Sequence, residues 1–104
     1  MVTRDHELEK IVRVFLDEIQ KRYHVDSAYL FGSYAKGTQN RWSDIDLAVV
    51  SPDFSEDLFE ERMTLTLLAA EIDERIEPKP FHPDSFKPID PLVYEIQKHG
   101  VKLI

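Results

Sequence analysis

The sequence contains no cysteine, which removes disulfide frameworks, thiolate zinc sites and cysteine nucleophiles together. Its longest uninterrupted apolar run covers residues 47–50, far short of the roughly 18 to 20 residues that cross a bilayer. The first residues are charged where a secretory signal would be apolar. These absences predict a cytoplasmic chain that does not enter a membrane.

Glycine is also scarce, and positive charges are outnumbered by negative ones. Three glycines and six prolines in 104 residues exclude collagen-like and low-complexity sequences. Thirteen Lys and Arg against twenty Asp and Glu leave a net charge of −7, so the surface as a whole repels a phosphate backbone. We therefore expect no general nucleic-acid binding. With 42% hydrophobic residues, we expect one globular domain over residues 1–104.

The first third of the sequence carries one helical and one strand pattern. Apolar residues recur at intervals of three and four over residues 3–24, which predicts an amphipathic helix with Thr3 as its N-cap. A short, aromatic-rich run over residues 27–31 is stopped by Gly32. This run predicts a buried strand followed by a turn.

A polar loop and a second strand come next. Residues 32–43 are too polar for a core and predict a loop with one helical turn. Alternation over residues 44–50 predicts a strand. One face carries Ile45, Leu47 and Val49, and the other carries Asp44, Asp46, Ala48 and Val50.

A second helix, capped by Ser55 or Asp57, is predicted to run to about residue 75. The strand predicted over residues 76–82 contains two prolines, which cannot donate to a ladder, so it must lie at an edge or be irregular. Five of the six prolines fall within residues 78–91, which predicts an extended connection with little regular structure.

The last segment predicts a short helix with Asp90 as N-cap, Pro91 in its first turn and Gly100 past its end. Residues 101–104 predict a final strand. The whole order implies a small mixed β-sheet covered by helices. We assign it to the α/β class, with α+β as the borderline alternative.

Asp44 and Asp46 are the first candidates for chemistry. An Asp-x-Asp pair alone is uninformative, because ten aspartates in a chain of this length give about one such pair by chance. On a strand, however, both carboxylates leave the same face, about 6 to 7 Å apart. Such a pair can hold divalent cations that clamp a phosphoryl group, although a solvated strand end is the simpler interpretation.

Gly32 and Ser33 form the second motif, at the end of the preceding strand. Glycine lets the backbone approach a ligand, and the serine hydroxyl adds a donor, which together suit an anionic phosphate. Taken singly, Gly-Ser is usually just a turn. Here it lies ten residues ahead of Asp44, and each motif stands at a strand end.

Together these residues make the chain resemble the nucleotidyltransferase superfamily that includes DNA polymerase beta, and especially its minimal nucleotidyltransferase branch. Members carry Gly-Ser, ten residues, then Asp-x-Asp, which matches Gly32, Ser33, Asp44 and Asp46. The order of helices and strands around the motif matches this branch over nearly the whole chain. The resemblance implies a nucleotidyltransferase fold.

The resemblance also implies roles for particular residues. Gly32 and Ser33 would bind the triphosphate of ATP, and Asp44 and Asp46 would ligate Mg²⁺ as catalytic acids, in a site for two ions. A third acid is expected on a neighbouring strand. Glu77 is the best match as metal ligand and catalytic residue, with Asp73 and Glu74 as rivals.

Weaker candidates lie in the loop between the two motifs. Lys36 and Arg41 can neutralise phosphate charge, although loop cations are more often merely solvated. Ser43 fits the surroundings of the family motif and is placed at the nucleotide. Trp42 either stacks on a base or packs the loop down.

The implied function is Mg²⁺-dependent transfer of AMP from ATP to a hydroxyl acceptor. Minimal members of the family are typically paired with a HEPN-type ribonuclease toxin, and some act as antitoxins that transfer AMP to a tyrosine of that toxin. We expect this chain to be such an antitoxin. We also expect it to form a homo- or hetero-oligomer. The alternatives are a stoichiometric antitoxin or regulatory subunit with a vestigial nucleotide site, and an adenylyltransferase of the aminoglycoside type.

Overall fold

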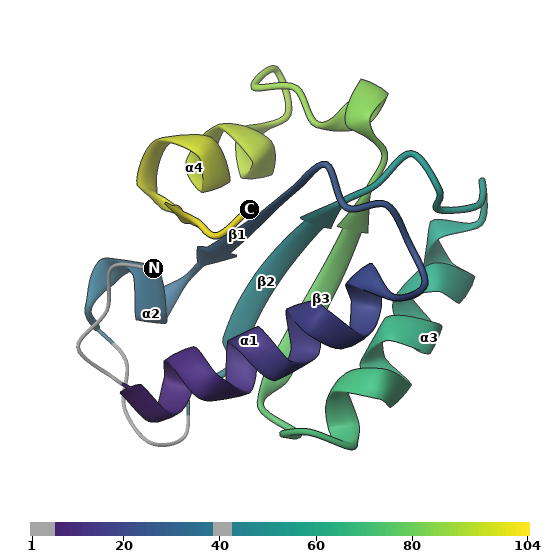
Figure 1. Cartoon of the computed structure of the whole chain (residues 1–104). Coiled ribbons are helices and arrows are strands. Elements are labelled where there is room, and N and C mark those ends of the chain that lie inside the picture. The colour runs from purple at the N-terminus through teal and green to yellow at the C-terminus, as the bar shows by residue number, and fades with distance from the viewer. Residues whose placement is uncertain (1–5, 39–42) are drawn as a thin grey trace.

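The computed structural model describes residues 6–38 and 43–104 (Figure 1). Thr3, Arg41 and Trp42 lie outside the described residues. The elements in chain order are α1 (His6–Gln20), β1 (Ser27–Phe31), α2 (Ser33–Lys36), β2 (Ile45–Val50), α3 (Leu58–Ala70), β3 (Ile76–Phe81), the 3-10 turn η1 (Pro83–Ser85), α4 (Pro91–His99) and β4 (Val101–Lys102).

The four strands form one mixed sheet in the order β3-β2-β1-β4. β1 pairs antiparallel with both β2 and β4, and β2 pairs parallel with β3. The parallel pair is connected through α3, because parallel strands need a long crossover, which a helix of this length supplies. The predicted α/β class with a small mixed sheet is therefore confirmed.

Each face of the sheet has its own apolar cluster. Ile45, Leu47 and Val49 of β2 pack with α1 and α3 on one face, where Phe15, Ile19 and Leu65 are fully buried. Ala48 and Val50 pack with α4 on the other face, which includes Val93 and Ile96. The predicted alternation along β2 is correct, and it divides the sheet into an α1/α3 face and an α4 face (Figure 1).

The proline-bearing strand β3 lies at the sheet edge, as predicted. At the end of its pairing with β2, the Ser51 N–H donates to the Phe81 carbonyl at 3.1 Å. In a parallel ladder the odd-numbered residues of β3 therefore turn their backbone groups toward β2. Pro78 and Pro80 turn theirs outward, where no donor is needed. Because of this register, residues 78–81 are regular strand, and the prediction of an irregular connection was wrong there.

The second long helix ends earlier than predicted, at Ala70 instead of about residue 75. The Ile72 and Asp73 N–H groups both donate to the Ala69 carbonyl, which closes the helix in a turn. The Asp73 carboxylate then accepts from the Arg75 backbone N–H at 2.9 Å. A side chain that captures the backbone two residues on offers an alternative to the helical ladder.

The first helix also ends before residue 24, at Gln20. A turn follows, in which the Tyr23 N–H donates to the Ile19 carbonyl. The next N–H, that of His24, donates to the Asp53 carboxylate at 2.6 Å. This side-chain acceptor from a distant loop fixes the chain in a non-helical course.

Two predicted N-caps are present. Asp57 accepts from the Glu60 N–H at 3.1 Å, which selects Asp57 over Ser55 as the cap of α3. Asp90 accepts from the Leu92 N–H at 2.9 Å and begins α4. Within the described residues no helix is long and apolar enough to cross a membrane.

Replacement of buried Leu65 should test how far α3 contributes to the core. Leu65 is 0% exposed on the α1/α3 face, whereas Leu67 on the same helix is 69% exposed. We expect Leu65→Ala to lower the free energy of unfolding by about 2 to 5 kcal/mol, because it leaves a cavity. The matched variant Leu67→Ala should change it by less than about 0.5 kcal/mol. Urea unfolding of both variants measures the difference, and equal effects would contradict this packing.

Candidate functional site

Carboxylates gather at the end of the sheet where β2 and β3 begin. In the parallel register Asp46 of β2 is aligned with Glu77 of β3. Aligned residues of neighbouring strands project from the same face. Asp44 comes two residues before Asp46 and is exposed, just ahead of β2. The sheet thus brings the Asp-x-Asp pair and Glu77 to one place.

The acids share a face with an apolar cluster, but α4 covers only part of it. Ala48 and Phe81, farther along the strands, are buried beneath α4. Asp46 is half-buried and Glu77 is 49% exposed at the uncovered end. The apolar part of the face holds α4, and the polar part remains accessible to a ligand.

Gly32 lies directly against the Asp46 carboxylate. Its φ of 73° and ψ of −150° belong to a region that side-chain-bearing residues rarely adopt. A Cβ at this position would overlap the Oδ2 atom of Asp46. The glycine of the Gly-Ser motif is therefore required both by its backbone conformation and by the approach of the acid. Ser33 begins the one-turn helix α2 directly after it.

The pKa of Asp46 is raised above the ordinary value of 3.8. Desolvation by burial is the main cause, and the negative charges of Asp44 and Glu77 add to it. Lys79 acts in the opposite direction, toward a lower pKa. The ionised form of Asp46 is thus disfavoured by the fold and by both neighbouring acids.

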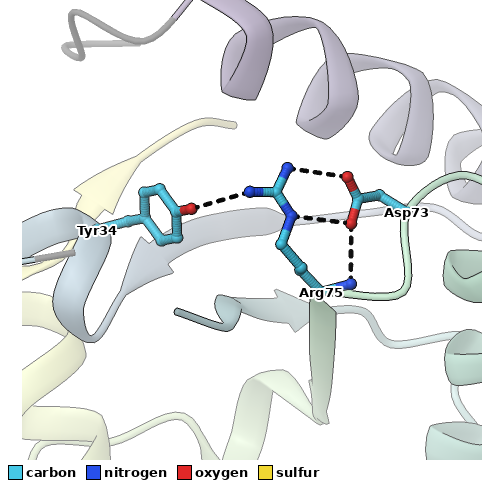
Figure 2. Close-up of polar contacts among 3 residues, drawn as sticks. All are labelled: Tyr34, Asp73 and Arg75. Atoms are coloured by element: carbon cyan, nitrogen blue, oxygen red, sulfur yellow. Dashed lines mark hydrogen bonds and ion pairs between the residues drawn. The ribbon is translucent and has the colours of Figure 1, made fainter. Parts of the chain in front are cut away.

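Three residues were candidates for the third acid, and of these β3 aligns Glu77 with Asp46. Asp73 is bound by Arg75, which donates from Nε to Oδ1 at 3.1 Å and from Nη2 to Oδ2 at 2.9 Å (Figure 2). This hydrogen bonding lowers the pKa of Asp73. Glu74 is exposed in the turn before β3. The register favours Glu77, whose catalytic role stays a prediction.

Glu77 also has a cationic neighbour. The Arg62 Nη2 atom of α3 lies 3.9 Å from its Oε2 atom, and both side chains are 49% exposed. An exposed pair at this distance is weak. Glu77 is therefore able to exchange Arg62 for another cation.

The donor set at this end of the sheet fits a magnesium ion in its chemistry. Carboxylate oxygens are the ligands that Mg²⁺ prefers. Burial is the main cause of the raised pKa of Asp46, and a divalent cation would offset the further contribution from the negative charges of Asp44 and Glu77. Over residues 6–38 and 43–104, no three acidic or histidine side chains are drawn together tightly enough to hold a metal ion. Any binding must draw the three acids closer.

The expected phosphate-binding residues fall around α2. Lys36 ends α2, where its Nζ atom lies 2.9 Å from the Glu95 Oε1 atom of α4. This pairing lowers the pKa of Glu95. Ser43 is half-buried immediately before Asp44, and Arg41 lies outside the described residues. Lys36 therefore lies near the site, and its ammonium group is already paired with Glu95.

Sequence reasoning missed two cations that act on these residues. Lys79 stands two positions after Glu77 on β3, so the period of two along a strand would have placed it on the same face. Arg75 was not singled out. Its contacts depend on Tyr34, 41 residues earlier, and on a turn that was predicted to be helix.

Comparisons with known proteins identify the family of the chain. The model of the nucleotidyltransferase domain family matches residues 12–102. Protein adenylyltransferase MntA of Shewanella oneidensis is 39% identical over 61 residues, which are 59% of this chain and 42% of that protein. The matched region therefore spans less than half the length of this relative.

Solved structures share the fold. A toxin–antitoxin crystal structure with AMP-PNP superposes with a TM-score of 0.65 at 29% identity, over 92% of this chain and 72% of that one. A mutant of the toxin–antitoxin pair MntA–HpeT gives a TM-score of 0.59 at 30% identity, over 92% and 71%.

Asp46→Asn should stabilise the protein at neutral pH. The pKa of Asp46 is raised in the fold, so its ionised form costs stability, fully above the folded-state pKa and not at all well below 3.8. Asparagine removes the charge at nearly the same volume. We expect its melting temperature at pH 7 to rise by about 1 to 4 °C, and the gain to vanish as the pH falls below about 4.

Asp73→Asn serves as the control of opposite sign. The pKa of Asp73 is lowered, so its carboxylate contributes stability above 3.8 that is lost as the pH falls through the folded-state pKa. Thermal unfolding between pH 3 and pH 8 should therefore show Asp73→Asn less stable than the parent at pH 7. Destabilisation of the Asp46 variant at pH 7 would contradict the electrostatic account of the site.

Proposed function

Because the chain belongs to the nucleotidyltransferase domain family, we propose that it transfers AMP from ATP, with Mg²⁺, to a hydroxyl group of a partner protein. The alignment of Asp46 with Glu77, with Gly32 packed on Asp46, is the observation that carries this proposal. The acceptor we propose is a tyrosine of a HEPN-type ribonuclease toxin, for which the chain is the antitoxin. Support comes from a relative named protein adenylyltransferase and from similar structures that are toxin–antitoxin pairs.

Asp44, Asp46 and Glu77 are the residues that would hold magnesium. The bound ion would supply positive charge that offsets the carboxylates and the polyphosphate. The chain itself contributes the register that aligns two of the three ligands and the glycine that keeps a side chain out of their way.

The turn after β1 would hold the triphosphate. At Gly32 the backbone has no side chain and lies against Asp46, and the Ser33 hydroxyl could donate a hydrogen bond to a phosphate oxygen. Lys36 would leave Glu95 for the phosphates, since their exposed ion pair is weak in water. Arg41 and Ser43 complete the proposed set.

The reaction would displace pyrophosphate. The acceptor oxygen attacks the α-phosphorus of ATP, the bond from that phosphorus to the bridging oxygen breaks, and the hydroxyl proton passes to a carboxylate. Glu77 is our choice for the proton acceptor because it is more exposed than Asp46 and lies beside it. A base must be within hydrogen-bond reach of the proton that it takes.

The acceptor is expected to bring its own binding surface. A net charge of −7 suits a basic partner through charge complementarity. This chain covers about seven tenths of each of the two similar toxin–antitoxin structures. The activity of those whole proteins is therefore a proposal for this chain. A stoichiometric antitoxin with an unused nucleotide site is the second candidate, since the acidic surface could bind a basic toxin without any metal ion.

Replacement of both aspartates decides between these functions. We expect the double variant Asp44→Asn, Asp46→Asn to lower AMP transfer to the toxin at least about 100-fold, because the ligands of the charge-stabilising ion are lost. Intact-mass measurement of the toxin after incubation with ATP and Mg²⁺ reports the transfer. Asp84→Asn, an exposed acid on η1, is the matched control and should transfer normally.

The two candidates give different results in the same assay. Loss of AMP addition together with loss of toxin neutralisation supports catalysis. If the double variant still neutralises the toxin while no AMP is added, the chain acts by stoichiometric binding and the enzymatic proposal is wrong.

A further inference from the structure

Arg75 contacts two of the segments that form the site, the start of β2 and the helix α2. It directly precedes the third segment, β3. Its carbonyl accepts from the N–H of Ile45, the residue between the two aspartates, at 2.7 Å. Its Nη1 atom donates to the hydroxyl of Tyr34 at 3.2 Å, and Tyr34 directly follows Ser33 (Figure 2). Arg75 also stands two residues before Glu77 at the start of β3.

The guanidinium of Arg75 is itself held in place. Asp73 accepts from Nε at 3.1 Å and from Nη2 at 2.9 Å, and the same carboxylate accepts from the Arg75 backbone N–H at 2.9 Å. A planar fork bound by a carboxylate at two points has a fixed orientation. The side chains of Arg75 and Asp73 are 32% and 18% exposed, so water competes only partly for these bonds. The remaining Nη1 atom is therefore aimed at Tyr34.

Tyr34 anchors α2 to the rest of the molecule. The helix is a single turn, and its N-cap Gly32 supplies no side-chain hydrogen bond. The Tyr34 side chain is 8% exposed and packs in the cluster on the α1/α3 face. Four residues of isolated helix have almost no stability of their own. The place of the Gly-Ser turn thus depends on where Tyr34 is held.

We propose that Arg75 is a positioning residue that sets the Gly32–Ser33 turn against Asp46 through the Tyr34 hydroxyl. This placement of the turn does not depend on whether the chain is an enzyme. Its consequence for ATP rests on the proposed function, in which that turn contacts the triphosphate. A loosened turn weakens ATP binding, whereas the acids on β2 and β3 keep their register. The effect therefore falls on KM for ATP and much less on kcat.

Tyr34→Phe tests this inference because it removes one oxygen and keeps the ring. The variant loses a hydrogen bond to a charged group, which water replaces only in part, so we expect KM for ATP to rise about 3- to 10-fold. The kcat should change less than about 2-fold. The matched control is Tyr23→Phe, a tyrosine that contacts Phe54 outside the site, and it should leave KM unchanged.

Amide hydrogen exchange gives a readout that does not depend on catalysis. The N–H groups of Lys36, Gly37 and Thr38 donate to Gly32 and Ser33 carbonyls within the turn. We expect them to exchange several-fold faster in Tyr34→Phe than in the parent or in Tyr23→Phe. Amides of β2 should be unaffected.

A double-variant cycle connects the effect to Arg75. Arg75→Lys keeps the charge but has no fork to reach both Asp73 and Tyr34, so it should raise KM in the same way. The combination Tyr34→Phe with Arg75→Lys should then show no further rise beyond Arg75→Lys alone. If the rises in KM of the two single variants multiply in the double variant, the residues act separately and the inference is wrong.

The remaining outcomes are also decisive. If Tyr34→Phe lowers the melting temperature while KM and turn exchange stay unchanged, the contact serves only stability and the inference is wrong. If the parent chain neither binds ATP nor transfers AMP, the proposed function fails. In that case the exchange rates at Lys36, Gly37 and Thr38 still decide whether Arg75 holds the turn.

Discussion

Repulsion among carboxylates at the start of β2 is the constraint on which the rest of the site depends. Two like charges about 6 Å apart repel by nearly 3 kcal/mol at an effective dielectric constant of about 20. Asp46 shows the effect, since burial and its two acidic neighbours raise its pKa. A fold selected for stability alone would place a neutral residue there. Positive charge from the proposed magnesium ion would make the same arrangement favourable.

The sheet tolerates this repulsion because its two faces are used differently. On the α1/α3 face, β1, β2 and β3 contribute buried residues throughout. On the α4 face the apolar cluster covers only the later part of β2 and β3, where Ala48 and Phe81 lie. The acids stand at the beginning of these strands, near the loop and turn that supply the other site residues. The apolar cluster and the proposed binding site thus occupy opposite ends of one face.

Much of this organisation could be predicted from short-range patterns. The alternation of Ile45, Leu47 and Val49 against Asp46 and Ala48 fixes which side chains share a face, and the structure follows it. Gly32 could be singled out because a glycine at a strand end lets the backbone approach another group closely. The sequence suggested a phosphate there, which stays a prediction, and the structure places the Asp46 carboxylate against it. Asp57 and Asp90 were found as caps because capping depends on residues only two or three apart.

Long-range contacts were beyond such reasoning. The end of α3 was misplaced because the Asp73 carboxylate captures Arg75, and propensity alone favours a longer helix there. The pairing of Lys36 with Glu95 joins residues 59 positions apart in sequence, and no periodicity indicates it. The third acid could be ranked only after the register of β3 was known, since a shift of one residue would have turned Glu77 to the other face.

Besides the burial of Tyr34, two polar contacts hold α2, and they differ in strength. Lys36 and Glu95 are 52% and 42% exposed, so their ion pair is weak and readily exchanged. The Arg75 contact with Tyr34 is partly buried and reinforced by Asp73. If Lys36 turned from Glu95 toward an anionic ligand, as proposed, α2 would keep its contact with Arg75. Lys36 could then be redirected while Gly32 stayed against Asp46, and the turn would not have to be rebuilt when the ligand bound.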